Sequence, residues 1–354
     1  RQGAMDGHSL SAWTDLRLSG VGPGVWSTST VARMAAASNS PALRELVRMD
    51  TQWLREDPDT LTALAVGDVV SGSLGWTRAT RIGGVRFGRD FGLQPYLSTA
   101  PSTLVRGQAV LPSTVDLYIN GLRQMSRQVQ PGEFIVEGAP LLNGVGQARL
   151  VVTDVNGQQR TVELPLYGTP RLLRAGLLDG SVAVGAVRED YGLRSFSYAA
   201  RPLATGSVRY GWSDALTLEA HAEADAGGAM TGAGAAWLLP GSLGVVNAAA
   251  AVSAFEGARG GQLHLGYQWS GPAWSVSLAS QRAGADFRDV AGGHGVPLPS
   301  AVDQAFLGTS TPWGSLGLGY VMQAIRGQPR ARLANASWSL PLPGAASISL
   351  ALMH

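Results

Sequence analysis

The fold is decided by the stretch ALTLEAHAE, residues 215–223, in which apolar and polar residues alternate. Leucine or alanine occupies every second position, and threonine, glutamate and histidine lie between them. Because successive side chains of a β-strand point to opposite faces, this repeat indicates strands with one apolar face. The repeat returns in four later segments: 263–270, 274–278, 316–322 and 348–352. One segment, 41–49, suits a short helix, and it suits loop and strand equally well.

The apolar face of such a sheet can meet either the core of a soluble β-sandwich or the lipid of a membrane. Glycine, serine and alanine fill much of the opposite face, which suits a wide, wet lumen. Aromatic residues lie near the ends of the expected strands, where an interfacial girdle would place them: Tyr210, Trp212, Trp237, Trp269, Trp274, Trp313 and Trp338. The pattern favours a transmembrane β-barrel, with an aromatic-rich sandwich core as the alternative.

The composition of the 354 residues agrees with such a barrel. Charged residues make up only 15%, and there are 47 glycines, as expected for many strands joined by tight turns. The net charge of +2 comes from scattered basic residues, so nucleic acid is not an expected partner. Cysteine is absent, which excludes disulfides, thiol nucleophiles and thiolate metal sites.

No segment of the sequence predicts a transmembrane helix. The best candidate, 243–255, is too short and carries Asn247. We therefore expect a membrane to be crossed by a closed barrel, which pairs every backbone polar group between strands. Residues 1–10 lack the apolar core of a signal peptide, so we expect any export signal to lie upstream.

Residues 111–166 differ from the rest because they are denser in valine, isoleucine and leucine. Five strand-like runs fall in this region: 114–119, 122–129, 133–136, 147–153 and 160–166. Asn120-Gly121 and Asn156-Gly157 are typical of two-residue hairpin turns, and Pro131-Gly132 suits a type II turn. A region of roughly 55 to 60 residues can bury a small core, so we predict a β-sandwich inserted between two stretches of barrel.

The same region resembles a known family. Three stretches are similar to the plug domain of fimbrial outer-membrane ushers: PSTVDLYING (112–121), VQPGEFIVE (129–137) and LVVTDVNGQ (150–158). The flanking stretches resemble the barrel segments on either side of that plug: DTQWLREDPDTLTALAVGD (50–68), IGGVRFGRDFGLQP (82–95) and PRLLRAGLLDGSVAVGAVREDYG (170–192). The motifs occur in the family's order across about residues 8–200, and beyond them only the alternating strands agree.

The resemblance implies an all-β fold, a transmembrane antiparallel barrel of about 24 strands with an inserted β-sandwich plug. It divides the chain into first barrel strands (1–108), plug domain (109–168) and further barrel strands (169–354). The sequence offers about five strand candidates before the insert and about twelve after it. We therefore expect the barrel to be incomplete within this chain.

The implied function is an outer-membrane pore that exports and assembles pilus subunits and that the plug closes at rest. The partners it implies are periplasmic chaperone–subunit complexes, pilus subunits in the lumen and outer-membrane lipid, and it allows a homodimer. A general porin or another barrel transporter is the first alternative, because it shares the strand pattern but has no inserted sandwich. A soluble β-rich protein acting on carbohydrate is the second.

The expected functional residues are gating contacts between the turn at 67–78 and the insert. Asp68, Arg78 and Arg81 lie at that turn. Arg123, Arg127 and Glu133 lie on the insert. Opposite charges at a wet interface attract weakly, so such pairs can hold a plug and still release it. The alternative is that these are ordinary solvated charges.

The sequence predicts no enzyme, no cofactor and no metal. The five histidines, at 8, 221, 264, 294 and 354, lack the spacing of metal ligands. Glu219 and Glu223 form a conceivable acid–base pair, but on an alternating strand they are expected to line a solvated lumen.

Overall fold

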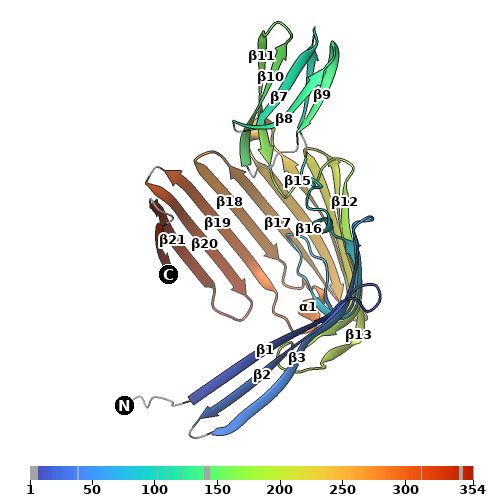
Figure 1. Ribbon diagram of the computed structural model, residues 1–354. Coiled ribbons are helices and arrows are strands. Elements are labelled where there is room, and N and C mark those ends of the chain that lie inside the picture. Colours follow the sequence, from blue (N-terminus) through green and yellow to red (C-terminus); the bar gives the residue numbers. More distant parts are fainter. Residues whose placement is uncertain are drawn as a thin grey trace.

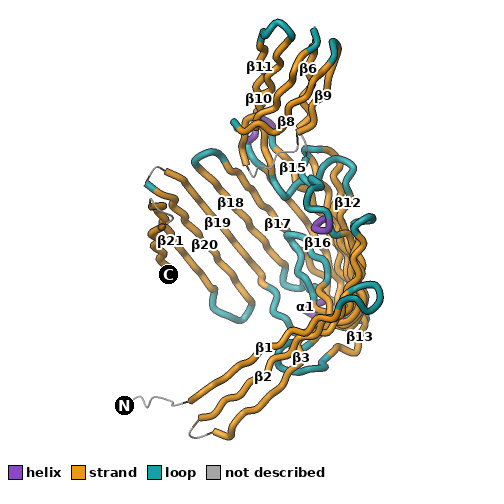
Figure 2. Tube along the Cα trace, in the orientation of Figure 1, coloured by secondary structure: helices purple, strands orange, loops and turns teal. Residues whose placement is uncertain are grey.

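The structure is a computed structural model that describes residues 7–37, 40–101, 103–109, 111–119, 121–138, 144–311, 313–342 and 346–353. Within these ranges it contains twenty-two strands, one short α-helix and two 3₁₀ turns (Figure 1). In the described part of the chain, no helix has the length and apolar character needed to span a membrane. Figure 2 shows how little of the chain is helical.

Sixteen strands form one antiparallel sheet in the order β1 to β5 and then β12 to β22. Its strands before the insert are β1 (Gly7–Leu18), β2 (Val25–Ala37), β3 (Ser40–Asp57), β4 (Thr62–Val70) and β5 (Arg81–Arg89). Its strands after the insert are β12 (Leu178–Arg188), β13 (Tyr198–Ser213), β14 (Leu216–Asp225), β15 (Gly228–Leu238), β16 (Val245–Phe255), β17 (Ala258–Ser270), β18 (Trp274–Ala283), β19 (Pro299–Thr311), β20 (Gly314–Ile325), β21 (Ala331–Leu342) and β22 (Ala346–Met353). The segment 41–49 therefore lies in a strand.

The insert forms two small sheets of its own. The strands β6 (Thr103–Ala109) and β9 (Gly132–Gly138) pair with each other. The other sheet has the order β11-β10-β7-β8, and its strands are β7 (Ser113–Ile119), β8 (Leu122–Val129), β10 (Gly144–Asp154) and β11 (Gln159–Gly168). Val115, Leu117 and Leu150 are buried between them in a separate apolar core. The five strand-like runs predicted in this region all lie in strands, and Asn120 of the expected turn falls outside the described residues.

The chain leaves the large sheet after β5 and returns beside it, because β5 pairs with β12. Since neighbouring strands alternate in direction, the connections fall on two opposite rims of the sheet. The insert lies beyond one rim (Figure 1). The connections that start from this rim contain the 3₁₀ turns η1 (Phe91–Leu93), after β5, and η2 (Pro240–Ser242), between β15 and β16. The connections 71–80, 189–197 and 284–298 start from the opposite rim, and the last of them contains the helix α1 (Val290–Gly293).

The large sheet is curved, and it buries polar residues on one face while it exposes apolar residues on the other. On β14, the polar residues Thr217, His221 and Glu223 are buried, whereas Leu218 is 38% exposed. On β17, Leu265 is 61% exposed while its neighbour His264 is buried. A soluble sandwich would bury the apolar residues instead. The outer face thus has the polarity that lipid requires, as the alternation predicted.

Candidate functional site

A hairpin between β4 and β5 covers part of the polar, inner face of the large sheet. Residues 71–80 are here called the inner hairpin. At its base, Ser71 N donates a backbone hydrogen bond to Thr80 O over 2.9 Å. The turn is closed where Leu74 N donates to Thr77 Oγ1 over 2.8 Å. Leu74 and Trp76 are buried although they lie in a loop. The inner hairpin therefore folds onto the sheet and does not project into solvent.

Trp76 fixes the inner hairpin to strands far away in the sequence. Its Nε1 donates to Glu219 Oε2 over 3.0 Å, and its carbonyl oxygen accepts from Gln262 Nε2 over 2.8 Å. Glycine at 232 and 234 makes room for the ring, because a Cβ there would lie 2.7 and 3.0 Å from its atoms. The hairpin is thereby docked across β14, β15 and β17.

Arg78 joins the inner hairpin to the connection 284–298. Its Nε and Nη2 donate to the two carboxylate oxygens of Asp289 over 2.6 and 2.5 Å, and Nη1 donates to Pro297 O over 3.0 Å. Asp289 also caps α1, since its Oδ1 accepts from Gly292 N over 2.8 Å. Two segments that both enter from one rim are thus held together by a bidentate ion pair.

We expect Arg78→Gln to loosen the connection 284–298. A glutamine loses the charge and the bidentate geometry, at a cost of about 2 kcal/mol for a partly buried pair. Amide hydrogen exchange in 284–298, read by mass spectrometry, should then quicken by about tenfold or more. Arg201→Gln is the matched control, because Arg201 is exposed and pairs at 3.5 Å with the exposed Glu256. Equal exchange rates in both variants would contradict the role given to Arg78.

Asp68 lies in a buried cluster of charges on the inner face. Its carboxylate pairs with Arg48 and, at 3.3 Å, with Arg188, whose side chain has no exposed surface. Tyr198 donates its hydroxyl to Asp68 over 2.6 Å, and Thr51 N donates over 2.9 Å. The cluster ties β3, β4, β12 and β13 together close to the rim of the inner hairpin.

Arg81 takes part in a second polar group nearby. Its Nη1 lies 2.7 Å from Asp50 Oδ1, and its guanidinium stacks at 3.8 Å on the ring of Tyr191. Tyr191 donates its hydroxyl to Asp50 over 2.6 Å. Burial and this hydrogen bond raise the pKa of Tyr191, so the hydroxyl keeps its proton and remains a donor.

The three charged residues expected on the insert lie apart from the inner hairpin. Arg123 is 3.9 Å from Asp116 of the insert itself, and Arg127 and Glu133 are exposed. In the described ranges, no hydrogen bond or ion pair links these three residues to 71–80. The structure thus brings Asp68 and Arg81 into contacts with strands of the large sheet, and it brings Arg78 into contact with the connection 284–298. A gating role for all six residues stays a prediction.

The segment 169–177, which returns from the insert, also lies on the inner face. Leu173 N donates to Thr217 Oγ1 over 2.8 Å, and Arg171 Nε donates to Gln268 Oε1 over 2.8 Å. Arg209 Nη2 donates to Arg171 O over 2.7 Å. The inner face is therefore lined by polar groups of connections that enter from both rims of the sheet.

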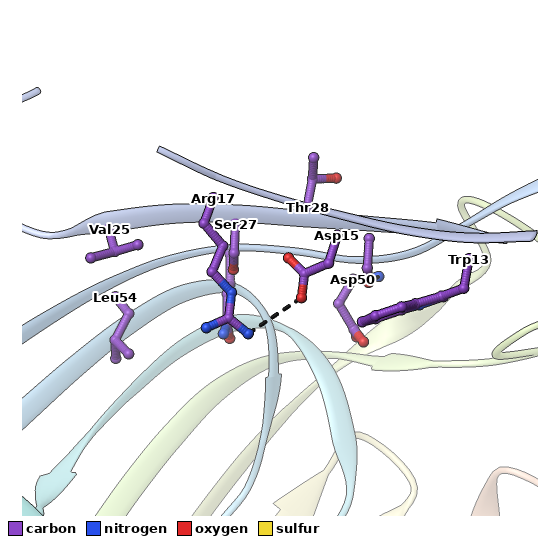
Figure 3. A pocket seen from close by; sticks show the side chains of 10 residues that line it. Trp13, Asp15, Arg17, Val25, Ser27, Thr28, Asp50 and Leu54 are labelled. Carbon is purple, nitrogen blue, oxygen red and sulfur yellow. Dashed lines mark hydrogen bonds and ion pairs between the residues drawn. The ribbon is translucent and has the colours of Figure 1, made fainter. Parts of the chain in front are cut away.

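A cavity of about 420 Å³ opens on the inner face of β1 to β3. Figure 3 shows Trp13, Asp15, Arg17 and Asp50 around it, with a bond of 3.3 Å from Arg17 to Asp15. Trp13 is 64% exposed on this polar face. It is therefore not part of an outer aromatic girdle, although it is an exposed tryptophan.

Sequence reasoning missed several residues of this site. Trp76, Asp289 and Arg188 are positioned by partners more than a hundred residues away, which no local pattern shows. Across the described part of the chain, no group of three or more histidine or acidic residues is arranged to hold a metal ion.

Comparison with known proteins identifies a family whose model matches this chain. Residues 18–270 match a family model described as outer membrane usher protein. Outer membrane usher protein PefC of Salmonella typhimurium is 32% identical over 148 residues, which are 38% of this chain and 17% of that protein. Outer membrane usher protein FimC of Bordetella pertussis is 28% identical over 131 residues, 37% of this chain and 15% of that protein. The matched segments thus span less than a fifth of these relatives.

Solved structures show the same fold at low identity. The crystal structure of the usher PapC translocation pore matches 98% of this chain and 80% of its own, with a TM-score of 0.60 and 16% identity. A chain of the E. coli P pilus tip assembly intermediate PapC-PapD-PapK-PapG matches 94% of this chain and 43% of its own, with a TM-score of 0.70 and 16% identity.

Proposed function

Because the chain belongs to the outer membrane usher family, we propose that it forms the wall of an outer-membrane pore that exports and assembles pilus subunits. The observation that carries this proposal is that the large sheet exposes its apolar face and covers its polar face, the reverse of a soluble protein. Its apolar face is exposed, as at Leu263 and Leu265, while polar residues and the inner hairpin occupy the opposite face. Such a wall suits lipid outside and an aqueous lumen inside.

The proposed partners follow from the family and from one assembly. PapC occurs together with PapD, PapK and PapG in a pilus tip assembly intermediate. By analogy, we assign to this chain pilus subunits in the lumen, delivered by a periplasmic chaperone, and outer-membrane lipid around the wall. A homodimer is compatible with this assignment. The role is transport, and we assign no catalytic residue and no cofactor.

We further propose that residues 109–168 act as the plug, between barrel strands in 1–108 and 169–354. The separate core of the insert supports this division. In this structure β10 approaches β17 and β11 approaches η2, so the insert lies beyond the rim and does not cover the inner face (Figure 1). Closure then requires the insert to move to the inner face, where exposed charges such as Arg123, Arg127 and Glu133 form weak, reversible contacts.

Replacing 109–168 by a short Gly-Ser linker in the full-length protein should raise its conductance in planar bilayers severalfold. The physical reason is that a folded sandwich of this size blocks the lumen when it moves inward. Asn156→Ala, in an exposed turn of the insert, is the matched control and should keep the resting conductance. Unchanged conductance after the deletion would contradict the plug while leaving the membrane wall intact.

A further inference from the structure

The inner face between the inner hairpin and strands β5, β12 and β13 contains a cavity of about 300 Å³. Its walls carry three arginines. Arg86 and Arg89 come from β5 and Arg209 from β13. Two carboxylates face this group: Asp179 lies 3.9 Å and Glu219 3.3 Å from Arg209. Asp90 is a third carboxylate that acts on Asp179, so the cavity is distinguished by guanidinium donors that lack acceptors and not by a surplus of charge.

Arg86 and Arg89 act on Asp179 through electrostatics, without the close contacts that other arginines of the inner face form. The Nε of Arg86 is buried and has no hydrogen-bond partner. Within the ranges that the structure describes, neither residue forms a hydrogen bond or an ion pair within 4.0 Å. A buried donor without a partner is costly, and its free energy falls when a ligand accepts from it.

Small residues create the space in front of these guanidinium groups. A Cβ at position 72 would lie 2.0 Å from Ser181 Oγ, and one at position 88 would lie 2.6 Å from Ser181 Cβ. Glycine at both positions therefore allows the inner hairpin and β5 to approach β12 closely. Ser73 and Ser181 also line the cavity, and their hydroxyls make no hydrogen bond in the described part of the molecule. The cavity thus offers hydroxyl and guanidinium donors together.

We propose that this cavity binds a small phosphate-class oxyanion. Guanidinium groups match the geometry of phosphate oxygens, and neutral hydroxyl donors complete its coordination. The neighbours of Arg86 on β5, Val85 and Phe87, are exposed on the opposite, outer face. The ligand therefore comes from the aqueous lumen and not from lipid. Because Ser73 belongs to the inner hairpin, the bound anion bridges this hairpin to the wall.

Isothermal titration calorimetry of the full chain in detergent micelles, with inorganic phosphate at constant ionic strength, tests the site. The double variant Arg86→Gln/Arg89→Gln should bind phosphate about tenfold more weakly or worse, since it loses two charged donors. Asp179→Asn should bind severalfold more tightly, because it removes the carboxylate that competes for the same cations. Arg259→Gln is the control for the loss of an arginine outside the cavity. Arg259 is exposed on β17 and does not line the cavity, so this variant should bind like the parent chain.

Circular dichroism of each variant establishes that the sheet is still formed. Micelles doped with phosphatidylglycerol distinguish the source of the phosphate, and we expect free phosphate to bind equally with and without this lipid. The proposal is overturned if the parent chain gives no heat with phosphate, or if phosphate binding is the same in the double variant. Competition by the lipid would likewise overturn the assignment to the lumen. None of these outcomes depends on pilus export.

Discussion

Leu265→Arg is expected to destabilise the large sheet strongly in lipid. Leu265 is central on β17, 61% exposed, and flanked on the same face by Ala248 and Ser280 of the adjacent strands. If this face contacts lipid, an arginine near the bilayer midplane costs about 2–4 kcal/mol. Unfolding by urea in lipid vesicles, followed by tryptophan fluorescence, measures the change directly.

Ser277→Arg on β18 is the matched control for this prediction. Ser277 pairs with Gln268, so both lie on the inner face, where water solvates a charge. The variant should lose much less stability than Leu265→Arg. If the two arginines cost the same, or if Ser277→Arg costs more, the assignment of the faces is wrong.

Asp68→Asn is expected to destabilise the protein by about 3–5 kcal/mol, because it breaks a buried ion-pair cluster. The side chains of Asp68 and Arg188 are 2% and 0% exposed, so water cannot replace the lost carboxylate. Arg48 and Arg188 would then face each other without a negative charge between them. The midpoint of urea unfolding should therefore fall strongly, with the unfolding slope unchanged.

Asp190→Asn provides the comparison for Asp68→Asn. Asp190 pairs at 3.8 Å with Arg194, and both side chains are exposed. Exposed pairs stabilise proteins by about 1 kcal/mol at most, so this variant should unfold close to the parent midpoint. A similar small effect for Asp68→Asn would show that the buried cluster does not hold β3, β4, β12 and β13 together.

The sequence predicted the sheet well because alternation is a local signal. Alternation alone assigns Leu263 and Leu265 to one face of the sheet and His264 to the other. The turn residues within 111–166 mark where the strands of the insert end. The family motifs also fall where the large sheet stops and resumes, at β5 and β12. Five strands precede the insert, as expected, and eleven described strands follow it in place of about twelve.

The candidate site was predicted only in part, because its contacts are long-range. Asp68, Arg78 and Arg81 were selected for their charge, and all three form ion pairs: Asp68 and Arg81 with strands of the large sheet, and Arg78 with the connection 284–298. Their partners could not be read from the sequence, since a loop's path across a sheet depends on three-dimensional packing. The glycines of β15 were a usable signal, because small residues on an inner face admit another segment.

The absence of cysteine allows the central claim, an outer face in lipid and an inner face in water, to be measured directly. Leu278→Cys and Ser277→Cys place a single nitroxide spin label on adjacent residues of β18 that face opposite sides. In lipid vesicles, relaxation by oxygen and by a water-soluble nickel chelate reports what each label contacts. We expect the label at 278 to be more accessible to oxygen and the label at 277 to the chelate. Equal accessibility, or the reverse order, would contradict an outer-membrane wall built from this sheet.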